Sequence, residues 1–250
     1  MPDNSAESTF AWDDVDYESI YQGKPPVEGS DVSLKATKAT PWDIGEAQPA
    51  VVELERSGKF SGEVLDAGCG LGENAMFLAD KGYRVTGIDV STTALDQARQ
   101  RATERGLEVE FVQSDATRLE ELADERFTTV LDSALYHCLT PEQQRTYAAT
   151  LRRVAKPGAH LHLFSDCGRG GFRLPQSISQ EDLRTRVGPH WDILDIEPAR
   201  YVTAFTKESI AAMDLKRLAS IGLTVKPDEI EVDERGRATG QVWYLHAVRR

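Results

Sequence analysis

Paired cysteines are the first thing that this sequence lacks. Its three cysteines, Cys69, Cys138 and Cys167, are odd in number and far apart, and no CxxC pair occurs. The spacing therefore predicts neither a disulfide framework nor a zinc site, and no metal is assigned. Unpaired thiols are typical of a reducing compartment, so we expect a cytoplasmic protein.

Long apolar runs and basic clusters are also missing. No apolar stretch approaches the roughly 18–20 residues that span a bilayer, and the N-terminal MPDNSAESTF has no apolar core of the signal-peptide kind. The formal net charge is -12. Nucleic acids and anionic membranes both need a cationic face, so neither is expected as a partner. A neutral or cationic small molecule is compatible with this charge, whereas the oligomeric state is not indicated.

Strand-like and helix-like segments alternate from residue 63 onward. Short apolar segments at 63–68, 83–90, 107–114, 127–133 and 160–166 have strand character. Ser91 is expected to cap one intervening helix, and Thr140-Pro141-Glu142-Gln143 reads as a capping box that starts another, which Pro157-Gly158 would close. The alternation predicts an α/β fold with a doubly wound, Rossmann-like sheet of mostly parallel strands. Strands at 191–202 and 241–248, with one helix over 207–222, are expected to finish the sheet as an antiparallel pair.

A glycine turn follows the first of these strands, in VLDAGCGLGEN (64–74). A plain strand-to-helix turn is one interpretation, and a nucleotide-cofactor site is the other. The spacing Gly68-x-Gly70-x-Gly72 departs from the dinucleotide fingerprint, because Glu73 stands where that fingerprint has its last glycine. Asp66, just before the turn, would repel a pyrophosphate but suits a ligand that carries an ammonium and a sulfonium.

Two further acids follow the next two strands. Asp89 ends the second strand, where an acid accepts hydrogen bonds from both hydroxyls of a ribose, and Val90 follows it within the same predicted cofactor site. Asp115 ends the third strand, where it can accept from an adenine amino group while the backbone of Ala116 meets the ring. Because these acids lie at successive strand ends, we expect them to meet one cofactor.

The ordered motifs resemble those of class I S-adenosylmethionine-dependent methyltransferases. The matching positions are Asp66, Gly68, Gly70, Asp89, Asp115 and the strand at 127–133. The resemblance implies S-adenosyl-L-methionine as the cofactor and a seven-stranded sheet whose last strand is antiparallel. It covers roughly residues 41–250, interpreted as one domain, after a tail and lid segment at 1–40.

A closer resemblance rests on PWDIGEAQPA (41–50), which is similar to the W-D-x-G-x-x-x-P segment of thiopurine and halide/thiol methyltransferases. Together with YQG (21–23) and DSALYHCL (132–139), it most resembles actinobacterial small-molecule methyltransferases of the heterocyclic-toxin (benzoquinoid) type. By this resemblance Trp42 would line the cofactor pocket, with Gln48 close by. The alternative is that Trp42 is a core aromatic that anchors the first helix.

The resemblance also implies a helical lid over the substrate, formed by residues 10–40. Tyr17, Ile20 and Tyr21 are candidate acceptor-binding residues on that lid, and Tyr136 is a further candidate. A lid excludes water and bulky substrates, which favours a small aromatic acceptor. We therefore expect methyl transfer to the oxygen of a phenolic or hydroxylated heteroaromatic compound. S-methylation of a thiol and N-methylation of a heterocycle remain open, whereas a silent cofactor-binding protein and a nicotinamide oxidoreductase are less favoured.

The segment DSALYHCL carries the candidate catalytic histidine. Asp132 is placed either to meet the methionine amino group of the cofactor or to position the next loop. His137 falls where a general base could reach an acceptor, and its ordinary pKa of roughly 6.5 suits that role. A packed, hydrogen-bonded histidine is the alternative. Cys138 is not expected to be a nucleophile, because methyl transfer needs no covalent intermediate.

Overall fold

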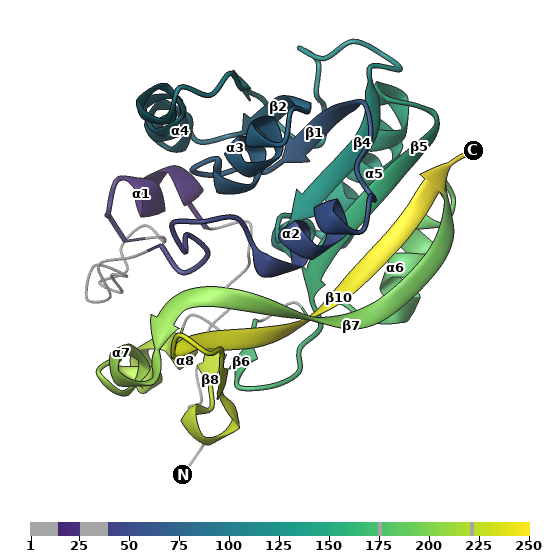
Figure 1. Ribbon diagram of the computed structural model, residues 1–250. Helices are drawn as coiled ribbons and strands as arrows, with labels where there is room; N and C mark the ends of the chain where they lie inside the picture. The colour runs from purple at the N-terminus through teal and green to yellow at the C-terminus, as the bar shows by residue number, and fades with distance from the viewer. Residues whose placement is uncertain (1–14, 26–39, 175–176, 221–222) are drawn as a thin grey trace.

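The computed structural model describes residues 15–25, 40–174, 177–220 and 223–250, and one large sheet dominates them (Figure 1). The main path of the sheet is β3-β2-β1-β4-β5-β10-β7. Its strands are β1 (Glu63–Ala67), β2 (Arg84–Asp89), β3 (Glu110–Gln113), β4 (Phe127–Ser133), β5 (Ala155–Asp166), β7 (Trp191–Thr206) and β10 (Arg237–Arg249). The short β9 (Glu231–Val232) pairs with β10, while β6 (Phe172–Arg173) and β8 (Thr224–Val225) form a separate small sheet.

The strand directions confirm the predicted fold class. β1 to β5 pair in parallel, and β10 is antiparallel to both β5 and β7. The last strand therefore inserts between β5 and β7 rather than lying at the edge. The sheet is one short strand larger than the predicted seven, because β9 pairs with β10.

Helices lie between the strands on both faces of the sheet. Their bounds are α1 (Tyr17–Tyr21), α2 (Pro49–Arg56), α3 (Glu73–Asp80), α4 (Thr92–Arg105), α5 (Pro141–Val154), α6 (Gln180–Val187), α7 (Lys207–Ala211) and α8 (Leu215–Ser220), with 3₁₀ turns η3 (Tyr136–Cys138) and η4 (Pro227–Glu229). Ser91 caps α4 through its side chain, and Thr140 and Gln143 form the predicted capping box.

Two expected helix boundaries are wrong. The single helix over 207–222 is instead α7 followed by α8, with a break before Leu215 at Asp214, a residue type that favours helix starts. Helix α5 ends at Val154, before the expected stop at Pro157-Gly158, which lies in β5. Both errors arise because residue propensities indicate that a helix ends nearby but do not determine the residue at which it ends.

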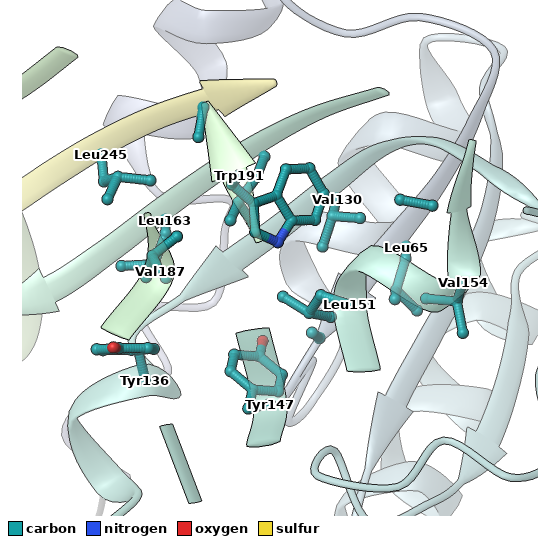
Figure 2. Close-up of a cluster of buried hydrophobic side chains, with 14 of the residues drawn as sticks. Leu65, Val130, Tyr136, Tyr147, Leu151, Val154, Leu163, Val187, Trp191 and Leu245 are labelled. Carbon is teal, nitrogen blue, oxygen red and sulfur yellow. The ribbon is translucent and has the colours of Figure 1, made fainter. Parts of the chain in front are cut away.

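A core on each face of the sheet fixes the strands. Figure 2 shows the cluster on the α5 face, in which Trp191, Tyr147 and Leu163 pack together. Trp191 has no exposed surface, and its indole nitrogen donates to the carbonyl oxygen of Ala148 at 3.0 Å. Among the residues that the structure describes, no helix combines the length and apolar character that a bilayer crossing requires.

Candidate cofactor and acceptor site

Each of the five parallel strands carries an aspartate at or just past its carboxyl end. They are Asp66 on β1, Asp89 on β2, Asp115 after β3, Asp132 on β4 and Asp166 on β5. Parallel strands end at the same edge of a sheet, where ligands of such folds bind. The five acids therefore gather along one edge, and their contacts distinguish them.

Asp66 is buried and lacks a partner. Its side chain is 1% exposed, and neither carboxylate oxygen has a hydrogen-bond partner among the described residues. Burial and the nearby Asp132 raise the pKa of Asp66 to about 7. A buried carboxylate without a donor is costly, and a cationic ligand removes that cost. Asp66 therefore fits the ammonium group of S-adenosylmethionine.

Asp89 holds the glycine turn. One oxygen accepts from the backbone N–H of Gly70 at 2.9 Å, and the other accepts from that of Ser91 at 2.9 Å. Gly70 has a φ of +53°, and a Cβ there would lie 2.7 Å from the Tyr21 hydroxyl oxygen, so a side chain would not fit. Val90, beside Asp89, is 59% exposed and offers an apolar surface to a ring.

Asp115 is exposed after β3. Its Oδ1 accepts from both the backbone N–H and the hydroxyl of Thr117, and its Oδ2 has no partner among the described residues. Ala116 packs against the core. These positions agree with an acid that accepts from adenine and a backbone that meets the ring. The cofactor contacts of these residues stay predictions.

The surroundings of Trp42 have features of both expected roles, a core aromatic and a residue beside the cofactor pocket. Its ring packs on the core of the α3 face, and its Nε1–H donates to the Tyr21 hydroxyl at 2.9 Å. The ring of Tyr17 lies 6.2 Å from that of Trp42. The Tyr21 hydroxyl, in turn, lies against Gly70. Trp42 is therefore both an anchor and a neighbour of the glycine turn.

A charged cluster holds the Trp42 segment to helices α3 and α4. Arg101 pairs with Asp43 and Glu73, and Arg105 pairs with Glu73 through both of its terminal nitrogens. Glu73 is thus neutralised by two arginines, so its charge alone does not repel a phosphate. The side-chain amide of Gln48 pairs with both backbone groups of Val202 on β7, while its backbone N–H donates to Asn74 at the start of α3. The expected place of Gln48 close to the cofactor stays a prediction.

Of the predicted lid at residues 1–40, residues 1–14 and 26–39 lie outside the described part of the chain. The described part includes α1, which lies beside α4 (Figure 1). The Glu18 carboxylate accepts from the hydroxyls of Ser91 and Thr93 and from the Thr93 N–H. These three donors hold the pKa of Glu18 at about 2 and attach α1 to the start of α4.

Both carboxylate oxygens of Asp132 accept hydrogen bonds from the protein itself. Oδ1 accepts from the N–H groups of Leu135 and Tyr136, and Oδ2 accepts from the Tyr147 hydroxyl at 2.9 Å. These contacts are those of a residue that positions the next loop, the second of its two expected roles. Tyr136 has no exposed surface and packs in the core shown in Figure 2, so its surroundings favour packing over the predicted acceptor contact.

His137 is buried and its tautomer is fixed. Its Nδ1 accepts from the backbone N–H of Asp166 at 3.2 Å. A neutral imidazole whose Nδ1 accepts carries its proton on Nε2, so that nitrogen donates. Burial lowers the pKa of His137 to about 4, which keeps the ring neutral. The structure thus favours a hydrogen-bond donor at this position over the expected general base.

Three residues near His137 complete the acceptor side. Burial raises the pKa of the Cys138 thiol to about 12, which agrees with its expected lack of nucleophilic character. Tyr201 and Asp166 were missed by the sequence analysis. The hydroxyls of Tyr201 and Ser133 lie 3.2 Å apart. Asp166 repeats the strand-end pattern of the other four acids, and that pattern was a signal that could have identified it.

Comparisons with known proteins identify the family of this chain. A family model described as a methyltransferase domain matches residues 64–158. The chain is 36% identical over 190 residues to a 2-heptyl-1-hydroxyquinolin-4(1H)-one methyltransferase of Mycobacteroides abscessus, which covers 74% of this chain and 79% of that protein. It is 27% identical to a probable thiol methyltransferase of Arabidopsis thaliana, over 49% of this chain and 55% of that protein. A solved structure from work on the conversion of a disulfide bond into a thioacetal group during echinomycin biosynthesis has a TM-score of 0.72 and 32% identity, over 93% and 90% of the two chains.

Proposed function

Because the chain belongs to the class I S-adenosylmethionine-dependent methyltransferases and acts on a small molecule, we propose that its acceptor atom is the oxygen of a hydroxylated heteroaromatic or phenolic compound. The observation that carries the proposal is the division of the sheet edge. The acids that would meet the cofactor, Asp66, Asp89 and Asp115, stand at the ends of β1 to β3, and the ends of β4 and β5 remain for the acceptor.

The cofactor supplies a methyl group already activated on a sulfonium, so the protein mainly aligns the acceptor with it. Asp66 would hold the ammonium end, Asp89 the ribose hydroxyls and Asp115 the adenine amino group. Val90 and the backbone of Ala116 would meet the adenine ring. Trp42 and Tyr21 would cover the glycine turn and limit the entry of water.

The acceptor side favours a compact aromatic molecule. Tyr17 and Tyr21 come from α1, and the buried phenol of Tyr17 lies near the Cys138 thiol without a hydrogen bond of regular geometry to any described residue. Such a hydroxyl can pair with a polar group of the acceptor. The relative that is named for a hydroxyquinolinone, an aromatic compound with an N-hydroxyl and a ring carbonyl, supports the same class of acceptor.

We assign His137 a donor role in this reaction. Its Nε2–H has no partner among the described residues, and its neutral state persists at any physiological pH. A donor there would hold an acceptor oxygen and stabilise negative charge as the hydroxyl loses its proton. To act as a base through Nε2, the ring would need its proton on Nδ1 instead, and it would then lose the hydrogen bond that Nδ1 accepts from Asp166.

S-methylation of a small thiol is the second candidate. The relative named as a thiol methyltransferase favours it, and a thiol of low pKa needs little help from a base. The protein's own fixed donor at His137 favours oxygen over sulfur, because sulfur is the weaker hydrogen-bond acceptor.

A panel of acceptors with methyl-labelled cofactor tests the proposal. The panel should contain matched hydroxyl, thiol and ring-nitrogen forms of the same heteroaromatic compounds. We expect label on the hydroxyl compounds and at most weak transfer to the others. Transfer confined to thiols would replace the proposal with the second candidate. A cytoplasmic location and the absence of a nucleic-acid partner stay predictions.

A further inference from the structure

Asp166 is the strand-end acid of β5, outside the part of the sheet edge that is assigned to the cofactor. It ends β5 and is 8% exposed. Its Oδ2 accepts from the backbone N–H of Gly168 at 2.9 Å, and its Oδ1 has no hydrogen-bond partner among the described residues. Its own N–H donates to Nδ1 of His137, so the imidazole lies one hydrogen bond from its backbone.

The other four strand-end acids either lie where the cofactor is expected or already accept hydrogen bonds from the protein. Asp66, Asp89 and Asp115 lie at the ends of β1, β2 and β3, where the cofactor is expected. Asp132 already accepts three hydrogen bonds from the protein. Asp166 is therefore the strand-end carboxylate that has an unused oxygen on the acceptor side.

The pattern of β5 places the side chain of Asp166 on the face of the sheet that carries Tyr201. Side chains alternate along a strand, so Asp166 shares a face with Phe164, which packs in the same core cluster as Tyr201. The Tyr201 hydroxyl meets Ser133 on β4. The carboxylate of Asp166 also lies near enough to Cys138 to raise the pKa of its thiol.

We propose that the Asp166 carboxylate takes the proton of the acceptor hydroxyl, while the Nε2–H of His137 holds the acceptor in place. This inference rests on the proposed function. The O–H bond breaks and its proton passes to Asp166, and the oxygen lone pair forms the new bond to the methyl carbon. The electrons of the old carbon–sulfur bond stay on sulfur, which becomes a neutral thioether. Asp166 then returns its proton to water.

The titratable neighbours of Asp166 do not compete for this role. His137 and Cys138 on η3 stay neutral, as does Cys167, whose thiol pKa is raised by burial. On β10 the residue opposite Asp166 is the apolar Val242, and the Arg169 guanidinium lies over the ring of Trp243. Burial raises the pKa of Asp166 to about 7, which lets it both take and release a proton near neutral pH.

The test compares wild type with Asp166→Asn on 1-hydroxyquinolin-4(1H)-ones and phenols graded by hydroxyl acidity. Asparagine keeps the acceptor oxygen for Gly168 but cannot take a proton. We expect kcat to fall about 100-fold or more for the least acidic hydroxyls and less than about threefold for the most acidic. The limb of the wild-type kcat/KM profile that rises toward pH 7 should disappear in the variant.

Binding gives a second reading that needs no turnover. The affinity for a weakly acidic phenol should rise up to about tenfold between pH 6 and pH 8 in wild type, because the ionised Asp166 can accept the phenol O–H, and should not change with pH in Asp166→Asn. Asp195→Asn, the same substitution at an exposed position on β7, is the matched control and should behave as wild type. Melting temperature and cofactor affinity show whether each variant is folded.

Two results would overturn the role of Asp166. An equal loss of kcat across the graded series would mean that Asp166 only shapes the site, and a phenol affinity whose pH dependence is the same in wild type and Asp166→Asn would mean that Asp166 does not meet the hydroxyl. Either result leaves the proposed function intact when wild type methylates the series. A wild type that methylates none of the hydroxyl compounds contradicts the proposed function, and the pH dependence of phenol binding still decides the role of Asp166.

Discussion

The two halves of the sheet edge manage their polar groups in opposite ways. At the ends of β1 and β3, Asp66 has no partner and Asp115 keeps one oxygen unpaired among the described residues. At the end of β4, Asp132 is saturated by backbone and tyrosine donors. The cofactor half therefore leaves Asp66 and one oxygen of Asp115 open to groups of a ligand, although Asp89 already accepts from two backbone N–H groups, whereas Asp132 in the acceptor half holds its own loop.

This difference has a physical reason. A cofactor of fixed structure brings its own ammonium, hydroxyl and amino donors, so acids can be left for them. The acceptor brings few polar groups, and an unpaired buried group beside it would cost free energy. On that side the Oδ1 of Asp166, the Nε2 of His137 and the buried hydroxyl of Tyr136 have no partner among the described residues, and the first two suit a single hydroxyl.

Asp66→Asn should have the largest effect of these substitutions, a loss of cofactor affinity. The amide removes the negative charge that an ammonium needs, and loss of one partner of a buried pair costs about 3 kcal/mol, or roughly 100-fold in affinity. Isothermal titration with S-adenosylmethionine measures this loss. The free protein should melt no lower than wild type, because the substitution removes a buried carboxylate that has no partner. Unchanged affinity would mean that the ammonium binds elsewhere.

The cofactor half was predictable because its signals are local in the chain. Asp66, Asp89 and Asp115 each stand at a strand end that hydrophobic patterning marks, and the glycine turn is continuous in sequence. The mostly parallel, doubly wound sheet followed from the same alternation. Asp166 stands at a strand end in the same way and shares the pattern.

The acceptor half was not predictable because its contacts are remote in the chain. The tautomer of His137 depends on a backbone N–H 29 residues away, and Gln48 pairs with Val202 across 154 residues. The type of a residue does not say which of its atoms already has a partner. His137 could therefore be identified as a candidate, but the chemical form of its ring could not.

His137→Leu tests the donor assigned to the acceptor half. Loss of one donor aimed at developing negative charge costs about 2–3 kcal/mol, so kcat should fall about 30- to 100-fold. His137→Gln offers an N–H at a similar reach and should recover part of that loss. Cofactor affinity should stay within about twofold in both variants. Steady-state kinetics on one hydroxyl acceptor gives the comparison. A loss in melting temperature without a loss in kcat would instead favour the packing role.

The pH dependence of cofactor binding separates the two halves. The pKa of Asp66 in the free protein is raised to about 7, and the cation binds only the ionised form. Affinity should therefore be full above pH 7 and should fall about tenfold for each pH unit below it. Titrations from pH 5.5 to 8.5 measure this slope. Asp66→Asn should flatten it, and a slope that survives the substitution would assign the titration to Asp132 or Asp166, whose pKa values also lie at about 7.

Glu18→Gln should have the smallest effect of these substitutions. It tests how the lid helix α1 is joined to the two halves of the site. Its carboxylate holds α1 on Ser91 and Thr93, next to the cofactor acid Asp89, while Tyr17 on the same helix reaches Cys138 on the acceptor side. Glutamine keeps one acceptor oxygen but loses the charge, so we expect a loss of about 1 kcal/mol in lid closure. The KM for the acceptor should rise about fivefold, with a smaller change in cofactor affinity. Equal changes for both ligands would mean that α1 closes on the whole site as one unit rather than on the acceptor first.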